Sequence, residues 1–208
     1  LTADVRVKTK INNLKSLNCS GRAHLENVGF KDLRLQAVEL DNMSCDLVFD
    51  SRKIKIDTLR GLFNGSKLNA KGVIDNKGVE ADVNLSSYKF DNVLLEDIKA
   101  KLFYADNVIS TSDLRFNVFG GGISSNNCKL IFADKENILN GSCKIEKVDV
   151  KRAFKDLGNF SQTVITDKNL EGRLSATATL NLHFDKGFNF LSDISSFAKL
   201  ITGHLSHF

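Results

Sequence analysis

Leu47–Gly72 reads LVFDSRKIKIDTLRGLFNGSKLNAKG, and Leu102–Lys129 reads LFYADNVISTSDLRFNVFGGGISSNNCK. Both stretches alternate apolar and polar residues, and each then reaches a Leu-Arg pair, a Phe and a glycine-containing turn before another alternating run. The two copies start about 55 residues apart, and self-similarity at such a period indicates stacked units that share one extended core. The repeat therefore predicts a long β-structure and directs attention away from a single catalytic pocket.

Alternation with a period of two continues along most of the chain and predicts strands with one buried face. Clear runs are Leu68–Ile74, Val79–Leu85, Ile98–Tyr104 and Leu174–Phe184. The chain contains no proline, which suits continuous ladders because proline removes a ladder donor. Short turn signals separate the runs and favour antiparallel neighbours: Asn64-Gly65, residues 75–78, Asp106-Asn107, Gly120–Gly122 and Asn140-Gly141.

Two segments depart from this alternation and predict helices. In Val150–Leu157 the apolar residues recur at helical spacing, and Gly158 follows as a stop signal. Phe188–Leu205 also shows helical spacing, with Gly203 near its end, and is predicted to be an amphipathic helix. Both helices are expected to pack against the sheet.

The predicted fold is mainly β with two helices: a long, twisted, mostly antiparallel sheet curled into a groove or open barrel, built from repeated β units. Residues 1–208 form one domain in this interpretation, with repeat-like units at about 30–85 and 86–145. Residues 146–208 then supply a helix, a long strand and the amphipathic helix.

A comparison of sizes limits how this sheet can be covered. About ten strands make a sheet ~48 Å wide, whereas a helix of about 16 residues is ~24 Å long. Two such helices cannot hide the whole apolar face, and soluble monomers rarely leave a large apolar patch bare. The sheet therefore closes as a barrel or sandwich, the commoner kind of core, or it curls into a gutter whose inner face meets something apolar.

Composition excludes several classes of function. The 208 residues are 42% hydrophobic and 26% charged, which is enough apolar content for a core. The net charge of +4 comes from scattered basic residues without the clusters of a nucleic-acid interface, so no nucleic acid is expected as a partner. No apolar run approaches the ~18 residues that span a bilayer. The chain begins within a strand-like pattern, ADVRVKTKI, so we expect a segment of a longer protein with any anchor outside it.

The sequence carries no recognisable catalytic or metal-binding motif. It has no GxSxG elbow, P-loop or HExxH, and its four histidines are dispersed. Gly120–Gly122 opens a strand, so no helix N-terminus is available there for a phosphate. The four cysteines form no CxxC pair, which argues against a zinc site. We expect no enzyme activity, no metal and no cofactor.

Cys128 and Cys143 flank a predicted hairpin whose turn lies near Lys135-Glu136. Counting outward from this turn pairs Phe132 with Leu139, Leu130 with Gly141, and Cys128 with Cys143. The two thiols would then face each other on the apolar side. They are either two small buried hydrophobes or a disulfide formed in an oxidising compartment.

Three longer motifs follow one another in a distinctive order. LRFNVFGGG at Leu114–Gly122 precedes a strand, then come IEKVDVKRAFKDL at Ile145–Leu157 and LEGRLSATATLNLHF at Leu170–Phe184. Two phrases of the form F-x-D/N-x-x-L occur earlier, at Phe30–Leu35 and Phe90–Leu95. This order resembles the C-terminal region of the AsmA-like family of bacterial envelope proteins, which is related to TamB-like and other bridge-type lipid-transfer proteins.

The resemblance implies a non-enzymatic, periplasmic segment that binds or conducts lipids along an apolar β groove, in outer-membrane assembly or phospholipid transport. It implies tethering to the inner membrane by an N-terminal helix outside this segment, and contact with envelope membranes through such outside regions. Its partner would be phospholipid or another acyl-chain lipid. The implied groove lining is Val83, Leu85, Ala100, Leu102, Phe116, Val118, Leu130, Phe132, Leu180 and Leu182.

Two alternatives stay open at this point. The same ten residues are equally typical of an ordinary closed core. The chain as a whole could also be a structural or adhesive β-repeat module that binds protein or polysaccharide through its outer faces.

Overall fold

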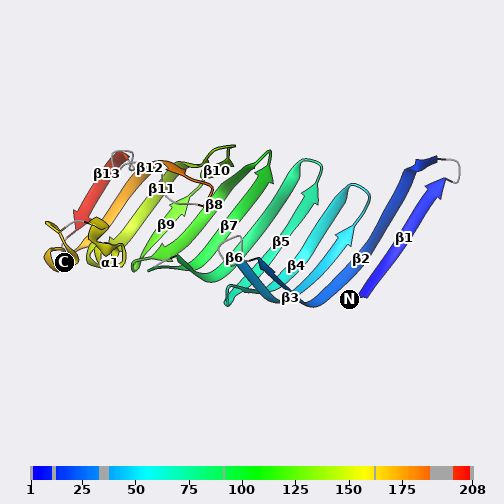
Figure 1. The fold of residues 1–208 in the computed structure, drawn as a ribbon, viewed down its shortest axis with the longest axis horizontal. Coiled ribbons are helices and arrows are strands. Elements are labelled where there is room, and N and C mark those ends of the chain that lie inside the picture. The colour runs from blue at the N-terminus through cyan, green and yellow to red at the C-terminus, as the bar shows by residue number, and fades with distance from the viewer. Residues whose placement is uncertain are drawn as a thin grey trace.

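The computed structural model describes residues 2–10, 13–32, 38–90, 92–161, 163–187 and 199–206. These residues form one antiparallel sheet of 13 strands, in which almost every strand pairs with the next in sequence (Figure 1). The strands are β1 (Thr2–Lys10), β2 (Asn13–Asp32), β3 (Val38–Phe49), β4 (Lys53–Phe63), β5 (Ser66–Asp75), β6 (Gly78–Phe90), β7 (Val93–Ala105), β8 (Val108–Val118), β9 (Gly121–Ser125), β10 (Lys129–Phe132), β11 (Asn137–Asp149), β12 (Arg173–Phe184) and β13 (Lys199–Ser206).

The sheet is open, because β1 and β13 stand at opposite ends of the strand order (Figure 1). The predicted mainly β, antiparallel and curled sheet is confirmed. Of the two predicted forms, a closed barrel or sandwich and a curled gutter, the structure adopts the curled gutter.

Strands β9 and β10 behave as one interrupted strand between β8 and β11, since each of them pairs with both neighbours. Side chains supply hydrogen bonds at the interruption. Asn127 Oδ1 accepts from the Ser142 backbone N–H at 3.0 Å and from its hydroxyl at 2.9 Å, and Ser125 Oγ donates to the Ser142 carbonyl at 2.6 Å. These bonds hold β11 to residues 125–127, where the ladder of backbone hydrogen bonds between β9 and β10 is interrupted.

Most of the predicted turns are confirmed. The turns Asn64-Gly65, Asp106-Asn107 and Phe119-Gly120 have positive φ at both central residues, as two-residue hairpins of type I′ require. The last of these replaces the predicted turn at Gly120–Gly122, since Gly121 and Gly122 already belong to β9. Residues 75–78 connect β5 to β6. The prediction at Asn140-Gly141 is wrong, since both residues lie inside β11. Glycine is required there for another reason: a Cβ on Gly141 would lie 2.8 Å from Cys128 Cα.

The first predicted helix is confirmed as α1 (Val150–Asp156). The Asp149 side chain accepts a hydrogen bond from the Arg152 backbone N–H at 2.9 Å, which caps the helix, and Gly158 follows with a φ of 60°. Two 3₁₀ turns follow α1, namely η1 (Gly158–Ser161) and η2 (Asp167–Asn169). Helix α1 contacts these turns and the end of β11, so it does not lie across the sheet.

The second predicted helix is wrong over its described part. Lys199–Ser206 is β13, which pairs with β12, and the rest of the predicted helix, residues 188–198, lies outside the described residues. In the β12–β13 register Leu200 is opposite Ala178 and Leu205 is opposite Leu174, with a register shift between the two pairs. Ile201 is the extra residue at this shift, and its i, i+4 spacing from Leu205 resembles a helix in sequence, which explains the error.

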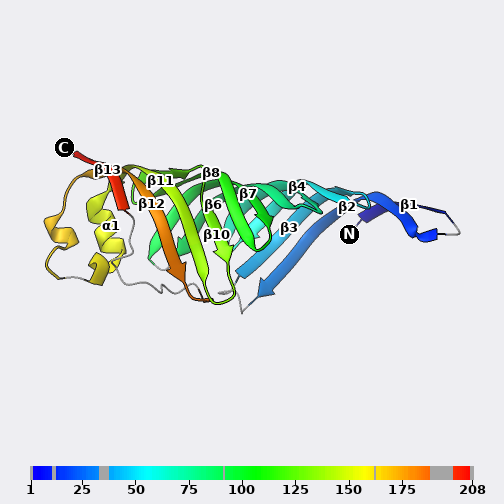
Figure 2. The ribbon, with the colours of Figure 1, turned by 90° about the horizontal axis from the view of Figure 1, so that it is seen from above.

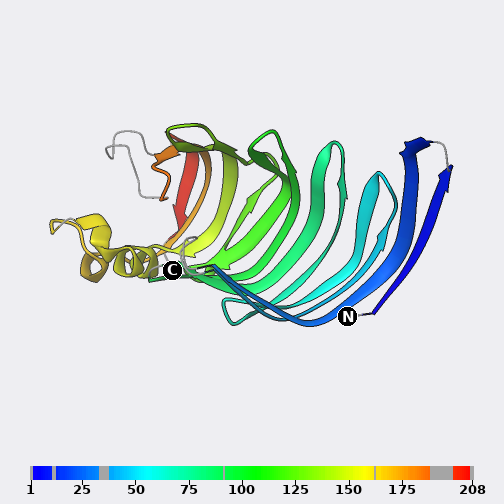
Figure 3. The same ribbon diagram turned by 45° about the vertical axis from the view of Figure 1, so that its right-hand side comes forward.

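Bulges bend the strands, and Figure 3 shows the resulting curl. Residues with left-handed backbone lie at the register shifts, with φ of 55° at Asn27, 50° at Asn42, 51° at Asp97 and 53° at Lys147. An extra residue at such a point increases the local bend and twist. Viewed from above, the sheet is a curved trough with α1 beyond one end (Figure 2).

Candidate functional site: an apolar groove face

One face of the sheet is apolar from β3 to β12, and we call it the groove face. Residues that pair directly across neighbouring strands have their side chains on the same face. A single row of such pairs crosses nine strands: Phe49, Ile54, Ile74, Val79, Tyr104, Ile109, Leu130, Leu139 and Leu182.

The opposite side of the sheet, the outer face, is mostly polar. The adjacent row of pairs runs along it through the same nine strands: Val48, Lys55, Val73, Glu80, Phe103, Ser110, Lys129, Asn140 and Asn181. Ion pairs lie on this face, such as Lys71 with Asp82 at 3.4 Å and Lys144 with Glu146 at 2.7 Å. The side chains of these pairs are exposed, so this part of the outer face is solvated and the pairs contribute little stability.

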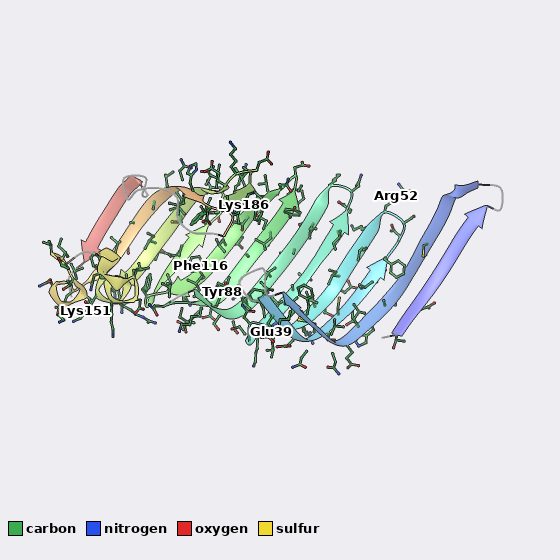
Figure 4. All side chains as sticks on the ribbon, viewed as in Figure 1. Glu39, Arg52, Tyr88, Phe116, Lys151 and Lys186 are labelled. Atoms are coloured by element: carbon green, nitrogen blue, oxygen red, sulfur yellow. The ribbon has the colours of Figure 1, made fainter. Side chains whose placement is uncertain are left out.

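The ten predicted lining residues all lie on the groove face. They come from β6, β7, β8, β10 and β12. Each belongs to the apolar row, lies an even number of residues from a row member on the same strand, or pairs with such a residue on the next strand, and so points to the same face. Val83 pairs with Ala100, and Ala100 pairs with Leu114 across a bulge in β8, which brings Phe116 and Val118 to the same side. Figure 4 shows Phe116 near the middle of the sheet.

Other groove-face residues were not named from the sequence. Ile109 and Leu139 continue the apolar row, and Ile123 pairs with both Phe116 and Ile145. The first repeat also contributes, through Leu47 paired with Ile56. The same alternation marks these residues, and extending it over both repeats would have found them.

Every buried side chain among the described residues belongs to the groove face. These side chains are Met43, Cys45, Ala100, Val118, Ser125, Cys128, Asn137, Cys143, Val148, Ala176 and Ala178. Most are small, whereas the larger apolar side chains of this face stay partly exposed. On a curled single sheet, side chains converge on the concave side and diverge on the convex side. The groove face is therefore the concave side, and its residues shield one another without a second layer.

Three hollows formed by described side chains are lined largely by charged groups of the outer face. One lies among Lys55, Lys71 and Asp82, and another among Lys99, Arg115 and Glu146. These charged hollows do not suit an apolar ligand, whereas the groove face is an open apolar surface.

The predicted register of the β10–β11 hairpin is wrong by two residues. Leu130 pairs with Leu139 and Phe132 with Asn137, because four residues, 133–136, connect the strands. Cys128 consequently lies beside Gly141, with Cys143 two residues further along β11. Both cysteines are buried free thiols, and burial raises the pKa of the Cys143 thiol, with a smaller contribution from Cys128.

The outer face holds one hydrogen-bonded cluster across β2, β3 and β4. The Asp46 carboxylate contacts His24 Nδ1 at 2.7 Å and accepts from the Thr58 hydroxyl at 2.8 Å. These two hydrogen bonds hold the pKa of Asp46 below its usual value, the bond to His24 having the larger effect. The cluster is solvent-exposed and stabilises strand pairing without forming a pocket.

Within the described ranges, no group of three or more His, Cys, Asp or Glu side chains could hold a metal ion. No helix in the described residues is long and apolar enough to cross a bilayer. No protein-family model, curated protein or solved structure matches this chain. Function is therefore inferred from the groove face itself.

Proposed function

We propose that this chain is a non-enzymatic, lipid-binding segment of the bacterial envelope whose groove face holds the acyl chains of phospholipid or a related lipid. As the AsmA-like resemblance implies, it would act in the periplasm in outer-membrane assembly or phospholipid transport, tethered to the inner membrane from outside this segment. The observation that carries this proposal is the unbroken apolar row across nine strands, on a face that no other described element covers.

The dimensions of the groove suit acyl chains. The apolar row crosses nine strands, which is eight steps of ~4.8 Å and a length of about 38 Å. The hydrocarbon core of a bilayer is about 30 Å thick, so one acyl layer is ~15 Å. A single acyl chain lying along the groove would therefore contact about three neighbouring strands, and several lipids could bind in succession.

The chemistry of the lining predicts which part of a lipid is recognised. Each buried methylene contributes about 0.8 kcal/mol, and this attraction has no direction. The groove face offers few polar groups, so affinity would come from acyl chains with little selection among head groups. The alternative of an adhesive module predicts a closed core, and the open, partly exposed apolar face favours lipid binding instead.

A pair of neighbouring substitutions tests the proposal. Leu102 lies on the groove face of β7, and Phe103, which is 42% exposed, lies next to it on the outer face. L102D places a carboxylate in the acyl-chain path, whereas F103D places the same group, on the same strand, in solvent.

The readout is lipid recovered by solvent extraction of purified protein, followed by mass spectrometry, before and after incubation with phospholipid. We expect the unmodified protein and F103D to retain lipid and L102D to lose most of it, with circular dichroism confirming that both variants are folded. Absence of acyl lipid from the unmodified protein, or equal loss in both folded variants, would contradict lipid binding by this face. If L102D does not fold, V83D provides a second groove-face variant.

A further inference from the structure

Two side-chain atoms in the described residues are buried without a hydrogen-bond partner, and both belong to the groove face. One is Thr111 Oγ1, on β8 opposite Leu102. The other is Oδ1 of Asn137, the first residue of β11, which lies two residues before Leu139 of the apolar row. Asn137 is 2% exposed and is the more deeply buried of the two. Since a buried acceptor without a donor destabilises a fold, such atoms are rare and point to a functional role.

The orientation of the Asn137 amide is fixed by its other atom. Asn137 Nδ2 donates to the Asp185 carbonyl at 3.1 Å, just after the end of β12. A carbonyl only accepts, so the amide nitrogen must face Asp185 and Oδ1 must point away from it. The atom without a partner is therefore the acceptor, and it suits a ligand that brings a donor.

Two further contacts tie the loop of residues 133–136 to the end of β12. Lys186 Nζ donates to the Ala133 carbonyl, and His183 Nδ1 contacts the Glu136 carboxylate at 2.9 Å. We call this edge of the sheet, residues 132–137 and 183–186, the β11 rim, and Figure 4 shows Lys186 near the end of β12. These contacts hold the β11 rim together, so the fold itself sets the position of the Asn137 side chain.

The β11 rim lies where a lipid head group would be found. A head group loses free energy when it is stripped of water, so it would lie at an edge of the trough while its acyl chains follow the apolar row. Asn137 is at such an edge, because β11 begins there. Phe132 and Phe184 pair with Asn137 on either side and share its face, so it stands between the rim and the apolar lining.

We propose that Asn137 Oδ1 accepts a hydrogen bond from the head group of a bound lipid, so that the β11 rim selects lipids whose head groups carry an N–H or O–H donor. Ethanolamine supplies N–H donors and glycerol supplies O–H donors, whereas choline has neither. The ring of Phe132 or Phe184 turns aside to let the head group reach the oxygen. This inference rests on the proposed function, since the acyl chains hold the lipid in the groove. The apolar lining selects little among head groups, and Asn137 adds that selection at the rim.

A series of lipids with identical acyl chains tests the inference on the unmodified chain. Phosphatidylethanolamine and its mono- and dimethyl derivatives keep at least one N–H donor, and phosphatidylcholine has none. Every member keeps the positive charge, so the series separates hydrogen bonding from charge. Native mass spectrometry of competing lipid pairs measures relative affinity.

We expect the first three lipids to bind about five- to tenfold more tightly than phosphatidylcholine, with the fall at the last methylation. Phosphatidylglycerol, which has O–H donors and no cation, should also bind more tightly than phosphatidylcholine. A preference confined to the ethanolamine lipids would assign the contact to an N–H donor.

The variant N137L removes the acceptor and leaves an apolar side chain with the same number of non-hydrogen atoms. It should bind every lipid of the series equally. The matched control is N140L, three residues along the same strand on the outer face, where Asn140 pairs with Lys129 and Asn181. This control should keep the preference of the unmodified chain.

Equal affinities across the series, or the same preference in N137L, would overturn this inference and leave acyl-chain binding in place. The series on the unmodified chain decides the matter even if N137L does not fold. Binding of no lipid at all would instead overturn the proposed function, and this inference with it.

Discussion

Small residues on the groove face show how tightly the concave side is packed. A Cβ on Gly61 would meet the Met43 side chain and lie 2.9 Å from the Asp41 carbonyl. A Cβ on Gly141 would lie 2.8 Å from both Cα and Sγ of Cys128. Convergence of side chains toward the inside of a curl explains why alanine and cysteine occupy six of the buried positions, and why Gly61 and Gly141 leave no room for a Cβ.

Gly141→Ala should therefore destabilise the fold by about 1–3 kcal/mol, because the added methyl presses on backbone atoms of Cys128. The control is Gly29→Ala, where the nearest atom to an added Cβ is the Leu40 carbonyl oxygen at 3.6 Å. This control should be neutral or should stabilise by up to about 1 kcal/mol. Urea denaturation midpoints provide the measurement, and equal midpoints for the two variants would contradict the packing described.

Thiol reactivity gives a second prediction at this scale. Burial raises the pKa of the Cys45 and Cys143 thiols, and the thiolate is the reactive form. At mildly alkaline pH both residues should alkylate more slowly than a cysteine in an unfolded peptide, and urea should abolish the difference. Mass spectrometry of iodoacetamide-treated protein measures this, and peptide-like rates in the folded chain would show that these thiols are not buried.

At the scale of single elements, bulges with left-handed residues give the strands their curvature. The alternation of apolar residues along the strand shifts by one residue at these bulges. Leu25 and Val28 therefore lie on the same groove face although they are three residues apart, and so do Ile145 and Val148. A strand without the bulge would turn the second half of its apolar residues to the outer face.

Lys147, with a φ of 53°, tests this role. Lys147→Val should destabilise by about 1–2 kcal/mol, because a β-branched residue is strained in the left-handed region. Lys147→Gly should be neutral or stabilise by up to about 1 kcal/mol. Lys99→Val, on the outer face of β7 and without a positive φ, should change stability by less than about 0.5 kcal/mol. The opposite order of Lys147→Val and Lys147→Gly in thermal or urea unfolding would contradict a left-handed bulge.

The strands and faces that apolar periodicity marks could be predicted from the sequence, whereas the register in which neighbouring strands pair could not. Alternation predicted the strands and the shared face of residues such as Leu102 and Leu130, and cap chemistry predicted α1. The β10–β11 register depended on loop length, which the sequence 133–136 does not define. The strand β13 was mistaken for a helix because its apolar spacing crosses a bulge, and Asn140-Gly141 was mistaken for a turn because packing against Cys128 requires the same residue type.

At the scale of the whole molecule, the described strands form one open sheet whose two faces differ in chemistry. Hairpins between sequential strands build it, so each strand pairs near its predecessor and the apolar row extends with every added unit. The sequence predicted an excess of apolar face over helical cover, and it left closure and curling as alternatives. The structure takes the curled form, since bulges bend the strands and the two end strands stay apart.

Photo-crosslinking along β7 tests most directly whether acyl chains lie on the groove face. Benzoylphenylalanine is placed in turn at residues 98 to 103, the protein is irradiated with bound phospholipid, and lipid adducts are measured by mass spectrometry. The structure predicts adducts at Ile98, Ala100 and Leu102 and few at Lys99, Lys101 and Phe103, a pattern with a period of two. Adducts of equal yield at both sets of positions, or none at any position, would contradict the claim that this concave face binds lipid.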